Sequence, residues 1–329
     1  MVAYITVSIA ALALALAGTT LPAREKQACP ALSWTTLGTA GGPMPTAERA
    51  EPANLLRAGD QQILVDTGDG TVNQLARIGQ TLGPIRAVFI SHHHLDHTGG
   101  LAAVIGLRWM NTYPGQLTIY GPPGTREMVD GIIASMAPQA RVGFGLGAMP
   151  STPASSVRVV EMQDGSTQML EGLAITSAAN SHFDHDGPLA DNPPVSLSYR
   201  FTLAGRSIAY TGDTGPSAAT TSLAKGADML VSEVIDLERT IADIQAHRKD
   251  APPQMLIDIR QHFARHHLSA SDVGMMAHEA GVGELVVTHF AIPGPLAQAA
   301  NSLRTGIARH YSGKVSLARD LSSYVVDCK

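Results

Sequence analysis

Four histidines and an aspartate lie close together, directly after a short apolar run. The run is Arg86–Ile90, and the polar cluster that follows reads SHHHLDH from Ser91 to His97. Four of the 13 histidines in the chain thus fall within six residues. Residues two apart on an extended segment point the same way, so His92 and His94 face one side. Because the end of a strand that leads into a helix is where an α/β protein presents its site, the cluster predicts an α/β fold with a metal centre.

The residue types in this cluster are those that bind zinc. Imidazole nitrogens bind Zn²⁺ at about 2.0–2.1 Å and carboxylate oxygens at about 2.0–2.2 Å. His92 and His94 are therefore candidate ligands of one ion. Asp96 and His97, which follow as the chain turns, are candidate ligands of a second. His93 lies between two ligands and points the opposite way, so we expect a structural role for it.

The rest of the chain alternates short β-rich runs with amphipathic helical runs. Hydrophobic residues make up 44% of the chain, which provides enough apolar area for a globular fold rather than a disordered one. Strands followed by helices, from Gln61–Val65 and Thr71–Gln80 onward, favour an architecture in which helices cover the faces of sheets. A tight hairpin at Leu203–Gly205, among longer crossovers, predicts mixed sheets.

Four further motifs, widely spaced along the chain, each carry an acidic or imidazole side chain. They are LVDTG with Asp66, NSH with His182, TGDT with Asp213 and VTHF with His289. Together with the histidine cluster, these motifs resemble those of the metallo-β-lactamase superfamily, from about Leu32 to the C-terminus. The resemblance implies a four-layer αββα sandwich with two mixed β-sheets, in a single hydrolase domain over residues 30–329.

The resemblance also implies which side chains bind metal. One ion is expected at His92, His94 and His182, and a second at Asp96, His97 and His289, with Asp213 bridging the two. Asp66 is expected to brace the histidine loop rather than to bind metal. His185, three residues after His182, remains an alternative ligand. We expect two Zn²⁺ per chain, although the same ligands also accept Mn²⁺ or Fe²⁺.

Two features narrow the resemblance to the ribonuclease Z and arylsulfatase-like branch. Asp213 disfavours the branch of the true β-lactamases, in which the bridging carboxylate is absent. The segment ADMLVSE, which ends at Glu233, and the segment HHLS, which contains His267, match the acidic and histidine motifs of this branch. The resemblance implies that Glu233 orients His267 above the metals. His266 is the alternative if the loop is offset by one residue, and a surface charge with a helix-cap histidine is the alternative without function.

These residues predict a binuclear zinc-dependent hydrolase. A metal-bridging hydroxide would attack a small phosphodiester or an aryl or alkyl sulfate ester, with Asp96, His267 and Glu233 as catalytic residues. An imidazole held by a carboxylate can protonate a leaving oxygen, an effect of about 10²–10⁴-fold. The alternatives are a lactonase or β-lactamase-like amidase that uses the same metals without His267, a metal-dependent oxidoreductase, and a metal-binding module without catalysis.

The charge of the chain and the length of one segment bear on its partners. The formal net charge is −5 and the pI is about 6.2, so binding to a phosphate backbone would gain little from counterion release. The resemblance implies a basic arm between His182 and Asp213, but only 31 positions separate them and no cluster of Lys or Arg lies there. We therefore expect a small-molecule ester as substrate, no nucleic-acid partner, and a chain that could form a homo-oligomer.

The first residues have the composition of a signal peptide. Ile5–Gly18 is an uncharged apolar run of fourteen residues, too short to span a bilayer comfortably. We predict a signal peptide at residues 1–23, no membrane anchor after its cleavage, and a periplasmic or secreted protein. An uncleaved anchor or a buried helix is the alternative. In an oxidising compartment, Cys29 and Cys328 could form a disulfide, and two unrelated thiols are the alternative.

An extra segment, 235–265, precedes the HHLS motif. It carries two helical runs and could form a lid-like insertion over the site. Most of its apolar residues are predicted to pack in the core instead. These residues are Ile241, Ile244, Met255, Ile257 and Phe263.

Overall fold

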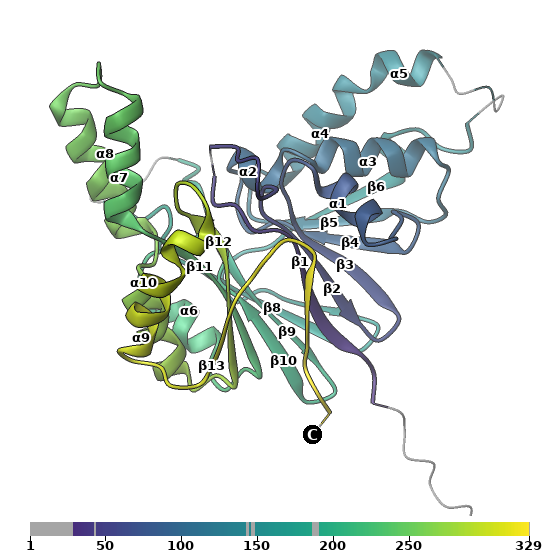
Figure 1. Cartoon of the computed structure of the whole chain (residues 1–329). Helices are drawn as coiled ribbons and strands as arrows, with labels where there is room; N and C mark the ends of the chain where they lie inside the picture. Colours follow the sequence, from purple (N-terminus) through teal and green to yellow (C-terminus); the bar gives the residue numbers. More distant parts are fainter. Residues whose placement is uncertain (1–28, 43, 143–144, 146–148, 186–190, 329) are drawn as a thin grey trace, which may run out of the picture.

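The computed structural model describes residues 29–42, 44–142, 145, 149–185 and 191–328. The predicted signal peptide, residues 1–23, lies outside the described residues and stays a prediction. Within the described part of the chain, no helix has both the length and the apolar character that crossing a membrane requires. Two β-sheets lie face to face, and helices cover their outer faces (Figure 1).

Both sheets are mixed, and each has seven strands among the described residues. The first runs in the order β14 (Ser322–Val325), β1 (Leu32–Gly38), β2 (Ala53–Ala58), β3 (Gln61–Thr67), β4 (Ile85–Phe89), β5 (Leu117–Gly121) and β6 (Val157–Glu161). The second runs in the order β13 (Lys314–Leu317), β12 (Glu284–Ala291), β11 (Met229–Ile235), β10 (Arg206–Tyr210), β9 (Leu197–Leu203), β8 (Leu173–Ala179) and β7 (Thr167–Leu170). Strands β3 to β6 are parallel in the first sheet, as are β10 to β13 in the second. Each sheet therefore combines a parallel and an antiparallel half.

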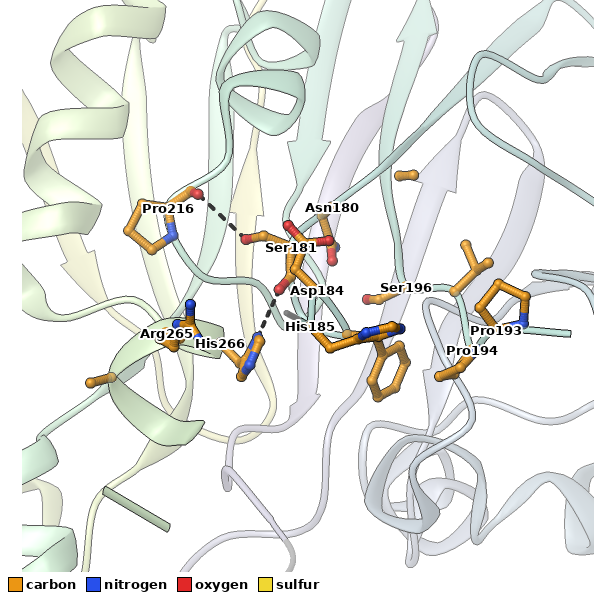
Figure 2. Close-up of a pocket in the computed structure, with 14 residues that line it drawn as sticks. Asn180, Ser181, Asp184, His185, Pro193, Pro194, Ser196, Pro216, Arg265 and His266 are labelled. Atoms are coloured by element: carbon orange, nitrogen blue, oxygen red, sulfur yellow. Dashed lines mark hydrogen bonds between the residues drawn. The ribbon is translucent and has the colours of Figure 1, made fainter. Parts of the chain in front are cut away.

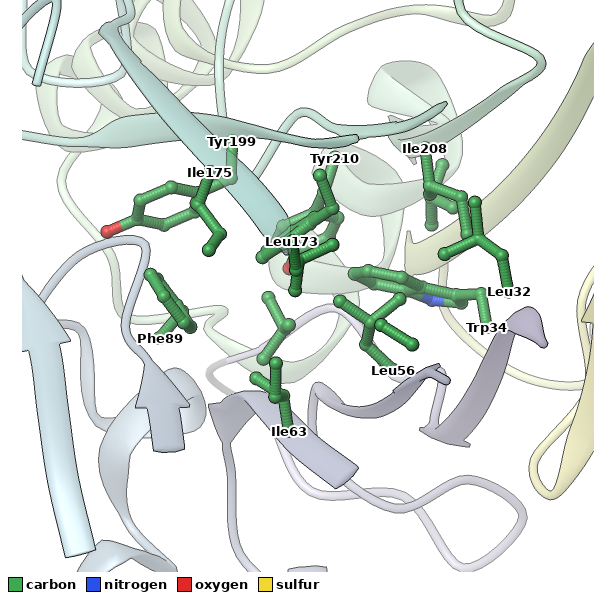
Figure 3. Close-up of a cluster of buried hydrophobic side chains, with 14 of the residues drawn as sticks. Leu32, Trp34, Leu56, Ile63, Phe89, Leu173, Ile175, Tyr199, Ile208 and Tyr210 are labelled. Carbon is green, nitrogen blue, oxygen red and sulfur yellow. The ribbon is translucent and has the colours of Figure 1, made fainter. Parts of the chain in front are cut away.

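The apolar core between the sheets is built from alternating side chains (Figure 3). Along β9, every second residue is apolar and belongs to this core: Leu197, Tyr199, Phe201 and Leu203. A period of two is what an extended strand with one face on the core requires. Phe89 of β4 packs edge-on against Tyr199 and Phe201, with ring centroids 5.5 Å apart in each pair. These aromatic contacts connect the two sheets.

Helices form the two outer layers. The helices near the first sheet are α1 (Thr71–Arg77), α3 (Leu101–Met110), α4 (Thr125–Ser135) and α5 (Ala137–Val142), and those on the second are α6 (Ala218–Leu223), α9 (Ala270–Ala280) and α10 (Leu296–Ala308). The described residues also form a short helix, α2 (Leu95–Thr98), and a 3₁₀ turn (Ala154–Ser156). In α3, the buried residues Leu101, Val104 and Ile105 recur with helical spacing and pack on the first sheet. The predicted αββα sandwich is thus confirmed.

The predicted insertion forms a helical hairpin that projects from the body of the molecule (Figure 1). Its helices are α7 (Leu237–His247) and α8 (Pro253–His266), whereas Ile235, where we predicted the insertion to begin, belongs to β11. The expectation that its apolar residues pack mainly in the core is wrong. Of the five named above, Ile241 alone is buried, and Ile257 is 47% exposed. Since the hairpin projects away from the sheets, one side of each helix stays in solvent.

A disulfide connects the two cysteines, Cys29 and Cys328, with Cα atoms 6.3 Å apart. Strand β1 pairs with β14, which brings Trp34 opposite Tyr324 and carries both ends of the described chain to one side. Because β1 is antiparallel to β2, and β2 to β3, the start of β1 lies at the edge opposite the end of β3. The disulfide therefore closes the end of the sandwich away from Asp66.

Candidate metal centre

Metal-ligating side chains from both sheets converge at one edge of the sandwich. They follow β4, β8 and β10 or lie in α2 and β12, and they are His92, His94, Asp96, His97, His182, Asp213 and His289. The carboxyl ends of parallel strands meet at one edge of a sheet, so residues far apart in the sequence lie together there. The structure brings together all seven residues that the sequence predicts as metal ligands.

The first group consists of His92, His94, His182 and Asp213. His94 Nδ1 lies 3.0 Å from His92 Nε2 and 3.2 Å from His182 Nε2. Asp213 Oδ2 lies 3.9 Å from His92 Nε2. The structure thus places His182 in the group, whereas the alternative ligand His185 lies outside it.

The second group consists of Asp96, His97, His289 and, again, Asp213. Asp213 Oδ1 lies 3.3 Å from His97 Nε2 and 3.1 Å from His289 Nε2. Asp96 Oδ2 lies 3.5 and 3.6 Å from the same two nitrogens. Asp213 therefore presents one carboxylate oxygen to each group, which is the arrangement expected of a bridging ligand.

This donor set fits divalent ions. Four ligands placed tetrahedrally at about 2.0–2.1 Å from Zn²⁺ are about 3.3 Å apart, close to the separations of 3.0 to 3.9 Å given above. Three converging atoms are buried and have no hydrogen-bond partner within the described ranges: His97 Nε2, Asp213 Oδ1 and His289 Nε2. Because a buried polar atom without a partner is costly, a cation at their common centre would satisfy all three.

Two irregular positions in the sheets aim side chains at this centre. Asp66 is an extra residue of β3 relative to β2, and His289 is one of two residues of β12 that face Glu233 of β11. Both have positive φ angles, 56° for Asp66 and 43° for His289. A β-bulge turns a side chain out of the regular alternation, and bulges are frequent next to active sites.

Asp66 braces ligands of both groups through one carboxylate oxygen. Its Oδ2 accepts hydrogen bonds from Ser91 Oγ at 2.8 Å, Tyr210 Oη at 2.7 Å and His97 Nδ1 at 2.8 Å. Ser91 Oγ accepts in turn from His92 Nδ1 at 3.0 Å. In the neutral form of each ring these contacts hold the proton on Nδ1, so Nε2 of His92 and of His97 then has a free lone pair for a metal.

Other groups orient the neighbouring histidines. His182 Nδ1 donates to the carbonyl oxygen of His266 at 3.0 Å, which leaves Nε2 free for metal. The ring of His266 turns away and bonds through Nδ1 to the carbonyl oxygen of Ser181 at 2.9 Å (Figure 2). His93 Nε2 bonds to Thr125 Oγ1 at 2.9 Å, outside both groups, in line with a structural role.

His267 lies beside the metal centre and is held by Glu233. Its Nδ1 donates to Glu233 Oε2 at 2.8 Å, and its ring centroid lies 5.1 Å from that of His182. Glu233 is fully buried; Oε1 accepts from the N–H of Thr214 at 2.6 Å, and Oε2 lies 3.9 Å from His289 Nδ1. Burial lowers the pKa of His267, but the Glu233 carboxylate outweighs burial and raises it to about 9. Glu233 thus orients His267 and favours its protonated form. The histidine beside the metal centre that Glu233 holds is His267, as the sequence predicts, and not the alternative His266.

The two groups differ in protonation. Burial lowers the pKa of His92 well below its ordinary value and that of His182 to about 3. Burial also opposes protonation of His97, but nearby carboxylates, Asp213 first, outweigh it and raise that pKa well above the ordinary value. The pKa of His289 is raised against burial in the same way. In the metal-free protein, the histidines of the first group are therefore neutral, while His97 and His289 of the second group hold protons.

Gly42 supports the second group and was missed by the sequence analysis. Its N–H donates to Asp96 Oδ2 at 3.1 Å. A Cβ atom at this position would lie 2.2 Å from the same oxygen, so the close approach requires glycine. The sequence analysis also missed Ser91 and Tyr210. The available signals were the Gly-Gly pair at 41–42 and the position of Tyr210 directly before the TGDT motif.

A cavity of about 680 Å³ opens next to the first group (Figure 2). Phe183 lines it, with ring centroids 5.2 Å from His94 and 4.7 Å from His182. His185 and Arg265 line the same cavity. A substrate bound at the metal centre therefore has open space on the side of His182.

Comparison with known families settles the relationship. The profile of the family described as "Beta-lactamase superfamily domain" matches residues 61–290. The chain belongs to the metallo-β-lactamase superfamily. The predicted resemblance is confirmed, and this superfamily member is a metal-dependent hydrolase with two candidate metal-binding groups.

The sequence of the superfamily member is similar to those of curated proteins that are named ribonuclease Z. It is 34% identical over 301 residues to "Ribonuclease Z" of Mycobacterium avium, a match that covers 89% of this chain and 98% of the relative. It is 35% identical over 301 residues to "Ribonuclease Z" of Mycolicibacterium paratuberculosis, with the same coverage. These relatives agree with the branch that the motifs around Glu233 and His267 predict.

Solved structures support the fold. The metallo-β-lactamase fold protein YhfI from Bacillus subtilis aligns with a TM-score of 0.65 at 21% identity, over 90% of this chain and 100% of that one. The short form of human tRNase Z aligns with a TM-score of 0.60 at 20% identity, with the same coverage. A diphosphatase from the PhnP family aligns with a TM-score of 0.60 at 16% identity, over 90% and 98%.

The prediction that this superfamily member has no nucleic-acid partner is wrong. Its relatives carry the name of an RNA-cleaving enzyme and match along nearly their whole length. The inference from a net charge of −5 failed because net charge averages over the whole surface. Recognition of a phosphate at a binuclear site depends instead on charge at one edge, where the metal ions themselves contribute.

Proposed function

We propose that the chain is a binuclear metal-dependent phosphodiesterase with RNA among its substrates. The observation that carries the proposal is the position of Asp213, which offers one oxygen to each of two ligand groups. The held imidazole of His267 lies beside them. The names of the curated relatives and of the human tRNase Z favour a phosphodiester over the sulfate ester that the sequence also allowed.

Two divalent cations bound at these groups would activate water and neutralise charge on a phosphoryl group. The seven side chains would hold and orient them, and Asp66 would keep the imidazoles of His92 and His97 in the required tautomer. Zinc suits a set of imidazoles and carboxylates, and Mn²⁺ or Fe²⁺ would use the same donors. Zinc is therefore the metal that we propose.

His267 is proposed to donate a proton to the leaving oxygen. Glu233 accepts from Nδ1 and stabilises the charged imidazole, so the proton on Nε2 is the one that can be transferred. The names of the curated relatives, rather than this pair, favour the phosphodiesterase over the lactonase or amidase alternative.

A substrate panel with the zinc-loaded protein tests the proposal. It contains bis(p-nitrophenyl) phosphate, p-nitrophenyl sulfate, a lactone, a β-lactam and a short single-stranded RNA. We expect turnover of the phosphate diester and of the RNA, with loss of both in the Asp213→Ala variant. Turnover of the sulfate or the lactone without the phosphodiester would contradict the proposal.

We also propose that the protein works in the periplasm or outside the cell. Disulfides persist in oxidising compartments and are rare in the cytosol, so the bond between Cys29 and Cys328 supports export. Fractionation of cells that express the full chain tests this. We expect the mature protein in the periplasmic or extracellular fraction, without residues 1–23, and full-length protein in the cytosol would contradict the proposal.

A further inference from the structure

A small pocket of about 110 Å³ opens beside His267, and nothing above assigns it a role. We call it the His267 pocket. Its lining residues include Gly42, Thr240, Asp243, Ile244, Phe263 and His267. It adjoins the metal centre, because His267 forms part of its wall and Gly42 donates to the metal-ligating Asp96.

The wall of the His267 pocket is mainly apolar. Thr240 directs its hydroxyl to the carbonyl oxygen of Ala291 at 2.9 Å, so this side chain has already used its donor. Asp243 also lines the pocket; its Oδ1 lies 3.4 Å from Nδ1 of His247 and its side chain is 47% exposed. None of the described lining residues is Lys or Arg. An apolar group is therefore favoured in this pocket, and an anionic group is not.

The projecting hairpin supplies one side of the pocket. Ile244 comes from α7 and Phe263 from the last turn of α8, where its ring lies 5.7 Å from that of His267 and nearly perpendicular to it, at 78°. Other parts of the wall come from the end of β12 and the residues after it. The hairpin, which contributes little to the core, therefore shapes the space next to the proposed proton donor.

We propose that the His267 pocket binds the apolar part of the leaving group, and that the α7–α8 hairpin thereby determines which esters are cleaved. This inference rests on the proposed function, in which His267 faces the leaving oxygen. A cavity of about 150 Å³ lined by apolar side chains holds a benzene molecule. The His267 pocket is somewhat smaller and open, so it suits one six-membered ring or a short alkyl chain.

Calorimetric binding of two phosphonates to the zinc-loaded protein tests the pocket. Methylphosphonate and phenylphosphonate carry the same metal-binding oxygens and differ in the apolar group, and neither is hydrolysed. We expect phenylphosphonate to bind about 10-fold or more tightly, because burial of an aromatic ring in an apolar pocket contributes on this scale.

Two tryptophan variants on the hairpin provide the comparison. Ile244→Trp fills the pocket and is expected to reduce the preference for phenylphosphonate to about 2-fold or less, with methylphosphonate binding unchanged. Ile257→Trp places the same indole on the exposed side of α8 and should keep the full preference. Zinc content and circular dichroism of both variants check that they are folded.

The outcomes separate the two proposals. If both phosphonates bind equally well, or if Ile244→Trp and Ile257→Trp behave alike, the pocket does not select the leaving group while the metal-centred function stands. If neither phosphonate binds to zinc-loaded protein, the proposed function fails, and the role of the pocket fails with it.

Discussion

Asp66 Oδ2 lies 2.8 Å from Nδ1 of His97, and the same oxygen accepts from Ser91, whose hydroxyl contacts Nδ1 of His92. One buried carboxylate oxygen thus sets the tautomers of two ligands, one in each metal group. Asp66 lies in a β-bulge with a φ angle of 56°, a backbone conformation that Asp and Asn adopt more readily than most residues. Loss of the Asp66 charge should therefore weaken the binding of both metal ions at once without distorting the backbone.

The Asp66→Asn variant tests this coupling. An amide NH₂ at Oδ2 cannot accept from His97 Nδ1, and in the flipped orientation it would face the N–H of Ser91 that Oδ1 accepts in the parent, so a hydrogen bond is lost either way. We expect zinc affinity to fall about 10–100-fold at both sites, as is typical when a group that orients a metal ligand is changed. Competition with a chelator measures it. Asp69→Asn, on the exposed side of the same loop, should bind zinc like the parent, and weakening of a single site would contradict the coupling.

The occupancy of the two metal groups should depend differently on pH. His92 and His182 are neutral in the metal-free protein, whereas His97 and His289 have raised pKa values and must release their protons before they can bind metal. Competition by protons thus grows as the pH falls, and it acts mainly on the second group. We expect two zinc ions per chain at pH 8 and a decline towards one near pH 6.

Equilibrium dialysis with metal analysis at each pH provides the measurement. The His289→Ala variant, which lacks a ligand of the second group, should hold one ion over the same range with a weaker dependence on pH. Parallel loss of both ions from the parent protein would show that the two groups titrate together and contradict the assignment. Less than one ion per chain at pH 8 would remove the binuclear centre altogether.

Removal of the His267 imidazole should affect catalysis rather than metal binding. Its Nδ1 is held by Glu233, and it belongs to neither ligand group. We expect His267→Ala to slow the cleavage of phosphodiesters with poor leaving groups about 10²–10⁴-fold, with a smaller effect on activated aryl esters. His262→Ala, an exposed neighbour on α8, is the control and should keep full activity. An equal loss on good and poor leaving groups would argue against proton donation.

The disulfide should stabilise the fold without affecting the site. It joins residues separated by 299 positions, and closure of so long a loop stabilises the folded state by up to about 5 kcal/mol in the chain-entropy account. We expect the Cys29→Ser, Cys328→Ser double variant to unfold at lower urea concentration with unchanged zinc content. Reducing agent should shift the parent to the same midpoint and leave the double variant unaffected. No shift on reduction would mean that the bond contributes nothing to stability.

Local patterns in the sequence indicated an α/β fold and the ligands of the histidine cluster, whereas the resemblance to the superfamily supplied the αββα sandwich and the ligands His182, Asp213 and His289. The alternation along β9 and the helical spacing in α3 require only near neighbours, so they can be read from a single segment. The seven metal ligands stand in short motifs at the ends of strands, where spacing and residue type are informative. Strands β1 and β14 show no sustained alternation of apolar and polar residues that would predict a strand. All seven residues of β1 are buried, and β14 is a four-residue edge strand.

Only the tertiary structure decided how these parts meet. The bulges at Asp66 and His289 arise from pairing between strands, and the hydrogen bond from Tyr210 to Asp66 spans 144 positions. The exposure of the α7–α8 hairpin could not be deduced either, because an amphipathic helix has the same pattern whether its apolar face meets a sheet or another helix. The residue types that bind metal are thus local information. Their tautomers, their supports and the pocket beside His267 depend on contacts that form only when distant segments pack together.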